Sequence, residues 1–215
     1  MLDAVRWGPR EGAAQQLVVL CHGVGADGHD LIDLGPQWAR ALPHAAFVAP
    51  DGPEPYEMAP MGRQWFRIGD HDPALMAAGV ARALPSLNAF LDAELARLAL
   101  PPDAYALMGF SQGAMMVLYA GLRRLVAPRC ILAFSGALLA PDSLAAERAN
   151  AAPVLLIHGE ADNVVSVARS RDAEAALGAA GVPVQAVYVP GLGHGIDATG
   201  LSAAAICLQR AFAGS

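Results

Sequence analysis

The sequence contains no lysine, because all 14 of its basic side chains are arginine. Schiff-base chemistry, a serine–lysine dyad and a phosphate-loop lysine are therefore excluded. Charge of either sign is scarce, at 16% of residues, and the net charge is −6. Since nucleic-acid backbones bind basic surfaces, we expect no nucleic-acid partner.

Cysteine and long apolar runs are also scarce. The three cysteines, Cys21, Cys130 and Cys207, are odd in number and set in apolar surroundings, which is typical of buried thiols in a reducing compartment. The first residues carry no apolar segment typical of a secretory signal. Apolar runs such as "GAMMVLYAGL" stop short of membrane-spanning length at Arg123 and Arg124. We expect a cytoplasmic protein without stable membrane insertion.

The sequence is rich in short apolar runs separated by helical patterns, with 55% hydrophobic residues in one expected domain, 1–215. The expected strands are "LVVLCH", "AAFVAP", "AYALMGF", "CILAFSG", "PVLLIHG" and "VQAVYVP". The expected helices cover 74–98, 112–125, 167–180 and 199–212, with a late start or a kink near Pro85 in the first. Continuous apolar strands alternating with helices predict an α/β fold, with a mostly parallel central sheet and helices on both faces.

Polar residues gather where these strands end, which is where ligand sites of such sheets form. One strand ends in Gly109-Phe110-Ser111-Gln112-Gly113 and passes at once into a helix. This is the G-x-S-x-G pattern of a nucleophile elbow, a strained turn that lifts a serine hydroxyl above the sheet at a helix N-terminus. The alternative is a glycine-flanked turn serine, but the position between strand and helix favours a nucleophile.

A serine nucleophile needs a base, and without lysine the base is histidine. In folds with this elbow the chain order is serine, acid, histidine. Of the six histidines, only His158 and His194 follow Ser111. His158 ends a strand and is expected to be a hydrogen-bonded structural residue, whereas His194 lies in the glycine-rich loop "PGLGHGI". We predict that His194 is the base.

The acid is expected between the serine and the histidine. Asp162, in "HGEADNVV", follows a strand in a loop at the same edge, and Glu160 is its nearest rival. Asp142 and Asp172 lie in less suitable places. An aspartate here would hold the imidazole tautomer and stabilise imidazolium. The alternative is that Asp162 caps the following helix.

An oxyanion hole would complete this site. The backbone N–H of Gln112 is one expected donor, and "HGVG" supplies the other through Val24. The segment "HGVGADGHD" also suggests a metal site, but its spacing fits no zinc pattern and Asp27-Gly28 is typical of a turn. We expect no metal.

Six segments together resemble the small cytosolic carboxylesterases that are grouped with phospholipases and acyl-protein thioesterases, in the α/β-hydrolase fold. They are "HGVGADGHDLIDL", "APDGP", "GRQWF", "GFSQGAMM", "HGEADNVV" and "GLGHGI", in family order over almost the whole chain. The resemblance implies Ser111 as nucleophile, Asp162 as acid, His194 as base, and Val24 with Gln112 as oxyanion donors. It also implies hydrolysis of carboxylic esters or thioesters without a cofactor, and often a homodimer. Two positions differ from the family pattern: Arg67 replaces an aspartate and Ser166 a proline.

The substrate is expected to be a small-molecule ester of short-to-medium acyl chain. The stretch from Ala137 to Ala152 is too short for a large lid domain. The irregular segment Asp51 to Pro73 carries an apolar set that either lines a groove or pins the segment to the core. The candidate substrate contacts are Trp65, Phe66, Met61 and Val165.

Three other hypotheses remain beside a carboxylesterase of this kind. One is a related acyl-protein thioesterase or lysophospholipase-like hydrolase. Another is a catalytically silent member of the fold that binds a ligand. The third is a different nucleophile, Cys21 or Cys130, although neither cysteine lies on an elbow.

Overall fold

The computed structural model describes residues 2–213, whose backbone is built around a seven-stranded sheet in the order β1-β3-β2-β6-β7-β8-β9. The strands are β1 (Ala4–Trp7), β2 (Gln16–Cys21), β3 (Ala45–Pro50), β6 (Tyr105–Phe110), β7 (Ile131–Phe134), β8 (Val154–Gly159) and β9 (Val184–Val189). All neighbouring pairs are parallel except β1 with β3. The six expected strands are thus confirmed, and β1 is an antiparallel edge strand that the sequence did not predict.

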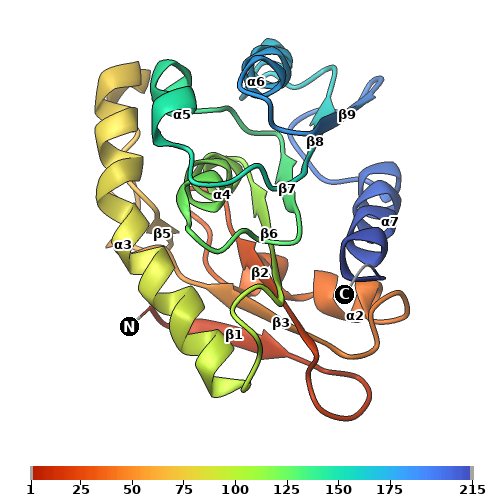
Figure 1. Ribbon diagram of the computed structural model, residues 1–215. Coiled ribbons are helices and arrows are strands. Elements are labelled where there is room, and N and C mark those ends of the chain that lie inside the picture. Colours follow the sequence, from red (N-terminus) through yellow and green to blue (C-terminus); the bar gives the residue numbers. More distant parts are fainter. Residues whose placement is uncertain (1, 214–215) are drawn as a thin grey trace.

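Helices cover both faces of this sheet, because successive side chains of each buried strand point to opposite faces. Leu17 and Val19 of β2 belong to one apolar cluster, and Val18 and Leu20 to the other. Figure 1 shows α3, α4 and α5 on one side of the sheet and α2 with α7 on the other. The helices are α1 (His29–Ile32), α2 (Leu34–Trp38), α3 (Pro73–Arg97), α4 (Gln112–Arg123), α5 (Pro141–Glu147), α6 (Ala168–Ala179) and α7 (Ala198–Ala213).

The longest helix, α3, begins earlier than its internal proline suggested. Asp72 caps it by accepting hydrogen bonds from two N–H groups of the first turn, and the helix passes through Pro85. Of the two outcomes expected at Pro85, a late start or a kink, the late start is therefore wrong: the cap and a buried apolar face outweigh the backbone hydrogen bond that proline removes. By length and composition α3 could cross a membrane, but its buried residues, such as Leu87 and Phe90, pack in the core as in a core helix.

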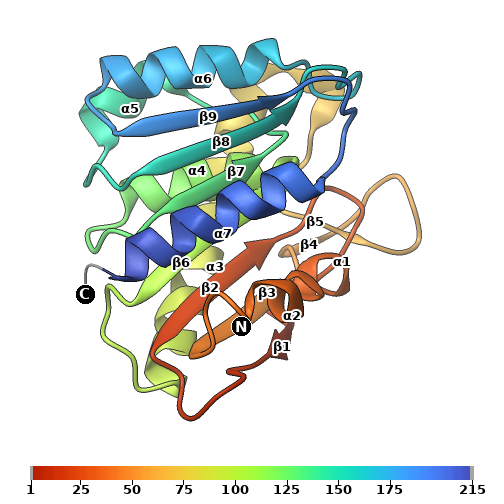
Figure 2. The same cartoon turned by 90° about the vertical axis from the view of Figure 1, so that its right-hand side faces the viewer.

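Two connections leave the sheet at its carboxyl edge, one after β7 and one after β3. Between β7 and β8 the chain carries only the short helix α5, so residues 135–153 hold no large lid domain. Between β3 and α3 the segment of residues 51–73 contains a small hairpin, β4 (Glu54–Pro55) and β5 (Arg63–Gln64), and a 3₁₀ turn, Gly69–His71. Figure 2 shows the part of this segment between β4 and β5 extending away from the body of the molecule.

Strand register brings the polar strand ends to one edge. Cys21 of β2 pairs with Gly109 of β6, and Phe110 of β6 pairs with Phe134 of β7. Gly159 at the end of β8 pairs with Val189 of β9. The residues that follow these strands therefore meet at the same carboxyl edge, as expected for a parallel sheet.

Candidate active site

Ser111 occupies the sharp turn between β6 and α4. Its backbone has a φ of 54° and a ψ of −117°, a conformation that non-glycine residues rarely adopt. The turn is held because Ser111 N–H donates to the Phe134 carbonyl at 2.9 Å, and the serine carbonyl accepts from Met115 N–H. Ser111 is the N-cap residue of the 12-residue helix α4. The strained turn predicted from the sequence is confirmed.

The two glycines of the elbow are required by close backbone approach. A Cβ on Gly113 would collide with the Cys21 carbonyl of β2, and a Cβ on Gly109 would collide with the Gly113 carbonyl. Gly23, in the loop after β2, is close as well, since its Cβ position lies 3.5 Å from Ser111 Cβ. The elbow is therefore packed tightly against β2 and against itself, with the "HGVG" loop directly beside its serine.

His194 and Asp162 come together at this edge from the loops after β9 and β8. His194 Nδ1 lies 2.7 Å from Asp162 Oδ2. The His194 ring packs against Phe110, the residue before Ser111, with ring centroids 4.9 Å apart. The imidazole is thus both bonded to the carboxylate and seated on the elbow. Within residues 2–213 no hydrogen bond joins the Ser111 hydroxyl to His194, a contact that often tightens only when substrate binds.

Asp162 is held as a buried carboxylate. Burial raises its pKa, but hydrogen bonds from His194 and from the N–H groups of Val165 and Val164 outweigh this, so the pKa lies below the usual value. The carboxylate is therefore ionised at neutral pH. It does not cap α6, which begins at Ala168, so the capping alternative is wrong.

The structure gives reasons against Glu160 as the acid and against a cysteine as the nucleophile. Glu160 forms an exposed ion pair with Arg171 at 2.9 Å. Cys21 is fully buried in β2, and burial raises the pKa of its thiol far above the usual value. Cys130 is also fully buried, and its hydrogen bond with Cys207, together with burial, raises the pKa of its thiol well above the usual value, so neither cysteine is a thiolate nucleophile. The turn expected at Asp27-Gly28 is also present, since Asp27 Oδ1 accepts a hydrogen bond from the His29 N–H at 2.8 Å.

The loop that carries Val24 is held by two backbone hydrogen bonds with Arg63. Gly25 N–H donates to the Arg63 carbonyl at 2.8 Å, and Arg63 N–H donates to the Ala26 carbonyl at 2.8 Å. In the part of the chain that the structure describes, Val24 N–H has no protein acceptor. The N–H of Gln112, in the first turn of α4, lies beyond the reach of the intrahelical ladder. Both backbone groups are available as donors next to Ser111.

His22, for which the sequence predicted no role, connects the beginning of this loop to the chain after β3. It is completely buried, its Nδ1 lies 2.7 Å from the Gly23 carbonyl, and its Nε2 accepts from Gly52 N–H at 2.9 Å. Nε2 accepts, so Nδ1 carries the proton. Burial lowers the pKa of His22, which favours this neutral form. In the sequence, the only sign of this role is that His22 directly precedes the first glycine of "HGVG".

Trp65 and Phe66 are anchors. Each side chain is only 1% exposed, which leaves almost no surface for a ligand. The Gln112 side chain binds their backbone: its Oε1 accepts from Trp65 N–H at 2.8 Å and its Nε2 donates to the Phe66 carbonyl at 2.6 Å. Trp65 Nε1–H also donates to the His22 carbonyl at 2.9 Å. These two residues pin the segment 51–73 to the core, one of the two outcomes considered for its apolar set.

Met61 and Val165 have different surroundings. Met61 is 80% exposed, on the part of the segment that extends from the body. Val165 packs partly buried against the core, and its backbone serves the acid: its N–H donates to Asp162 Oδ1 and its carbonyl lies 2.8 Å from His158 Nε2. No substrate contact of either side chain follows from this geometry alone.

The two positions that depart from the family pattern have local partners. Arg67 Nε lies 3.4 Å from Glu57 Oε2, an ion pair across the exposed segment. Ser166 Oγ accepts from Ala168 N–H at 3.3 Å, at the beginning of α6.

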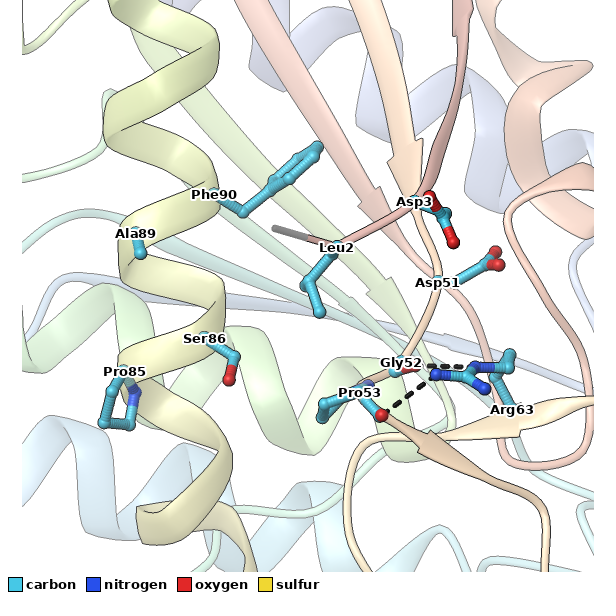
Figure 3. A pocket seen from close by; sticks show the side chains of 10 residues that line it. All are labelled: Leu2, Asp3, Asp51, Gly52, Pro53, Arg63, Pro85, Ser86, Ala89 and Phe90. Carbon is cyan, nitrogen blue, oxygen red and sulfur yellow. Dashed lines mark hydrogen bonds between the residues drawn. The ribbon is translucent and has the colours of Figure 1, made fainter.

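Two cavities lie near the catalytic edge. The one in Figure 3, about 560 Å³, lies between the first residues, the chain after β3 and α3, with Arg63 bonded to the carbonyls of Gly52 and Pro53. None of the candidate site residues lines it. The other, about 270 Å³, is lined by Leu138 and Leu139 from the chain after β7, the first residues of α5, Pro73 and the first turns of α6, and again by none of the candidate site residues.

A sequence profile of the phospholipase/carboxylesterase family matches residues 8–211. The chain belongs to this family. It is 34% identical to the esterase YpfH of Escherichia coli K12 over 184 residues, which cover 86% of this chain and 78% of that protein. It is 28% identical over 194 residues to an acyl-protein thioesterase 1 of Gibberella zeae, covering 82% of each. The crystal structure of esterase PE8 superposes with a TM-score of 0.93 at 42% identity, covering 97% of this chain and 98% of that one.

Membership in the family confirms the α/β-hydrolase fold and the enzyme class. The protein is a hydrolase of the carboxylesterase and acyl-protein thioesterase family. The resemblance found in its sequence motifs is thereby confirmed over nearly the full chain.

Proposed function

We propose that the protein is a serine carboxylesterase in which Ser111, His194 and Asp162 act as a catalytic triad. The observation that carries the proposal is the 2.7 Å contact between His194 Nδ1 and Asp162 Oδ2, made by an imidazole seated beside the strained serine turn. Nδ1 faces a carboxylate and carries the proton, so Nε2 is left as the base.

The reaction follows from these roles. Ser111 Oγ attacks the ester carbonyl carbon while His194 Nε2 takes the hydroxyl proton, and Asp162 stabilises the imidazolium. The negative oxygen of the tetrahedral intermediate accepts hydrogen bonds from the N–H groups of Val24 and Gln112. The intermediate collapses, His194 protonates the departing alcohol, and water then hydrolyses the acyl-enzyme by the same steps. A thioester would react identically, with a thiol leaving.

The cavity of about 270 Å³ supports a short-to-medium acyl chain as substrate. Gly136, two residues before Leu138, packs beside the nucleophile, since its Cβ position lies 3.3 Å from the Ser111 carbonyl, although Ser111 itself does not line the cavity. Leu138 and Leu139, which are 6% and 3% exposed, form its apolar side, and Asp142, Arg169 and Asp172 form its charged side. Each methylene buried there would add about 0.8 kcal/mol of binding until the cavity is full. The value of kcat/KM should then rise with acyl length and fall for long chains.

Labelling with a fluorophosphonate tests the nucleophile. This reagent phosphonylates only serines activated by a base and an oxyanion hole. We expect one adduct per chain, mapped to Ser111 by mass spectrometry, and none in Ser111→Ala. Ser135→Ala, a buried serine after β7, is the matched control and should label normally. An adduct on any other residue would refute the assignment.

A p-nitrophenyl ester series with acyl chains of two to sixteen carbons tests the substrate class. We expect an optimum at short-to-medium length and no jump in rate when the substrate passes its solubility limit. Acyl-thioesters measured in parallel would identify the thioesterase alternative by a higher kcat/KM. Activation at a lipid interface would contradict a site that has no lid to open.

A further inference from the structure

Two of the three cysteines lie side by side, although they are far apart in the sequence. Cys130 directly precedes β7, and Cys207 lies in α7. Both are free thiols, and a hydrogen bond joins them. The sequence predicted that all three thiols are buried; this is wrong for Cys207, which is partly exposed on α7. The third, Cys21, is fully buried in β2.

Both thiols line a cavity of about 640 Å³ that none of the candidate site residues lines. The cavity runs along α7, from which Ala203 and Ile206 also line it, and it begins at the amino ends of β7, β8 and β9. Ser111 and His194 lie beyond the carboxyl ends of strands of the same sheet, so the cavity is separate from the candidate active site. Its volume is ample for a small molecule to reach Cys207.

The two thiols differ in how readily they ionise. The hydrogen bond from Cys130 lowers the pKa of Cys207; burial opposes this, and the nearby charge of Arg210, three residues further along α7, lowers the pKa again. The same hydrogen bond, together with burial, raises the pKa of Cys130. Cys130 therefore donates its S–H and Cys207 accepts it, which makes Cys207 the thiolate of the pair.

We propose that Cys207, beside Arg210, is a modification site for peroxides, and that Cys130 converts the oxidised Cys207 into a disulfide within the chain. A partly exposed thiolate next to a cation and a second thiol is the arrangement that reacts with peroxides and is resolved reversibly. The proposal is independent of the proposed esterase function, because it uses no residue of the triad.

The reaction takes place in two steps. The Cys207 thiolate attacks one oxygen of a hydroperoxide, the O–O bond breaks, and the other oxygen takes a proton from solvent and leaves as water or an alcohol. Cys207 is then a sulfenic acid, and the peroxide has been reduced by two electrons. The Cys130 sulfur attacks the Cys207 sulfur, the S–O bond breaks, and the hydroxyl leaves as water with the Cys130 proton. The disulfide ties α7 to the beginning of β7, and an added dithiol reduces it back to two thiols.

Alkylation of the native protein with iodoacetamide at neutral pH tests the reactivity of Cys207. Since the thiolate is the nucleophile, we expect Cys207 to react about tenfold or more faster than Cys130 and Cys21. Equal rates at Cys207 and Cys130, or a faster reaction at Cys21, would overturn the proposal. This measurement needs neither a variant nor esterase activity.

Arg210→Gln tests the charge beside the thiolate. Without the cation, alkylation of Cys207 should slow about two- to fivefold, the range expected for an exposed charge. Arg82→Gln removes an exposed arginine of α3, on the other face of the sheet, and is the matched control, which should leave the rate unchanged. An equal rate in both variants would contradict the role of Arg210.

Peroxide treatment followed by trypsin tests the disulfide. All basic side chains are arginine, so trypsin places the three cysteines in separate peptides, residues 11–40, 130–148 and 172–210. After hydrogen peroxide we expect the second and third peptides to be linked within one chain and to separate with dithiothreitol, while the first keeps a free thiol. A link only between two chains, or oxidation of Cys21 at the same rate, would overturn the proposal.

Two variants assign the steps. In Cys130→Ser the sulfenic acid of Cys207 has no resolving thiol, so we expect dimedone to trap it in the peptide 172–210 and to trap far less in the native protein. In Cys207→Ser the remaining thiols should stay reduced under the same treatment. Oxidation of Cys130 in that variant, or equal trapping in the native protein and Cys130→Ser, would show that the assigned roles are wrong.

Discussion

The Ser111 elbow and the segment of residues 51–73 meet at Gln112, but they are held in different ways. The elbow is held by exclusion: backbone atoms leave no room for side chains at Gly109 and Gly113. The segment is held by a few directed bonds at its base, two of them from the Gln112 side chain, while Met61 on its extended part is almost free of contacts.

This difference leads to different expectations for substitutions in the two regions. Chemistry at the serine needs atoms placed to within a fraction of an ångström, and close-packed backbone supplies that rigidity. Recognition of acyl chains that differ in length tolerates an adaptable surface, for which methionine is suited. Substitutions in the elbow should therefore abolish activity, whereas those in the extended part should only change substrate preference.

The largest effect is expected from the triad itself. Ser111→Ala and His194→Ala should each lower kcat by about 10⁴-fold or more, and the double variant should be little worse, since triad residues act as a unit. Steady-state kinetics on a p-nitrophenyl ester would measure this. Additive losses would show that the two residues do not act together.

An intermediate effect is expected from Gln112→Ala, which removes the side-chain hydrogen bonds between the elbow and the segment of residues 51–73. The change leaves Trp65 N–H and the Phe66 carbonyl buried without partners, so we expect the free energy of unfolding to fall by about 2 to 4 kcal/mol. The backbone N–H at position 112 remains, so kcat should fall far less than in Ser111→Ala.

Denaturant unfolding of the Gln112 variant, followed by tryptophan fluorescence, gives the stability change. Gln37→Ala, which removes a glutamine from the exposed surface of α2, is the matched control and should be nearly neutral. Native stability in Gln112→Ala would mean that the segment is not anchored through this side chain.

The smallest effect is expected from Met61→Ser. The side chain is exposed, so stability should stay within about 0.5 kcal/mol of the native value. If Met61 touches the acyl chain, kcat/KM should fall about two- to fivefold for medium-chain esters and not for acetate esters. Leu125→Ser, at an equally exposed position beyond the far end of α4, should change neither. A loss that is the same for every chain length would contradict a role in acyl recognition.

The sequence alone predicted the six parallel strands, the four long helices and the order of Ser111, Asp162 and His194. These features are local or follow from chain order: continuous apolar runs favour buried strands, and a serine between glycines at a strand–helix junction favours one turn. The edge strand β1 was missed because four residues with mixed polarity carry little local signal.

Only the tertiary structure decided which polar groups share partners. Nothing in "HGEADNVV" shows that His158 bonds to the Val165 carbonyl and to Ser170, or that it lies 3.1 Å from the carboxylate oxygen that His194 contacts, because that depends on how α6 and the loop after β9 pack around the end of β8. Likewise, the aromatic pair Trp65 and Phe66 suits a groove or a core equally well by composition. Long-range packing placed both in the core, because burying their large apolar surfaces and satisfying their backbone through Gln112 stabilises the fold.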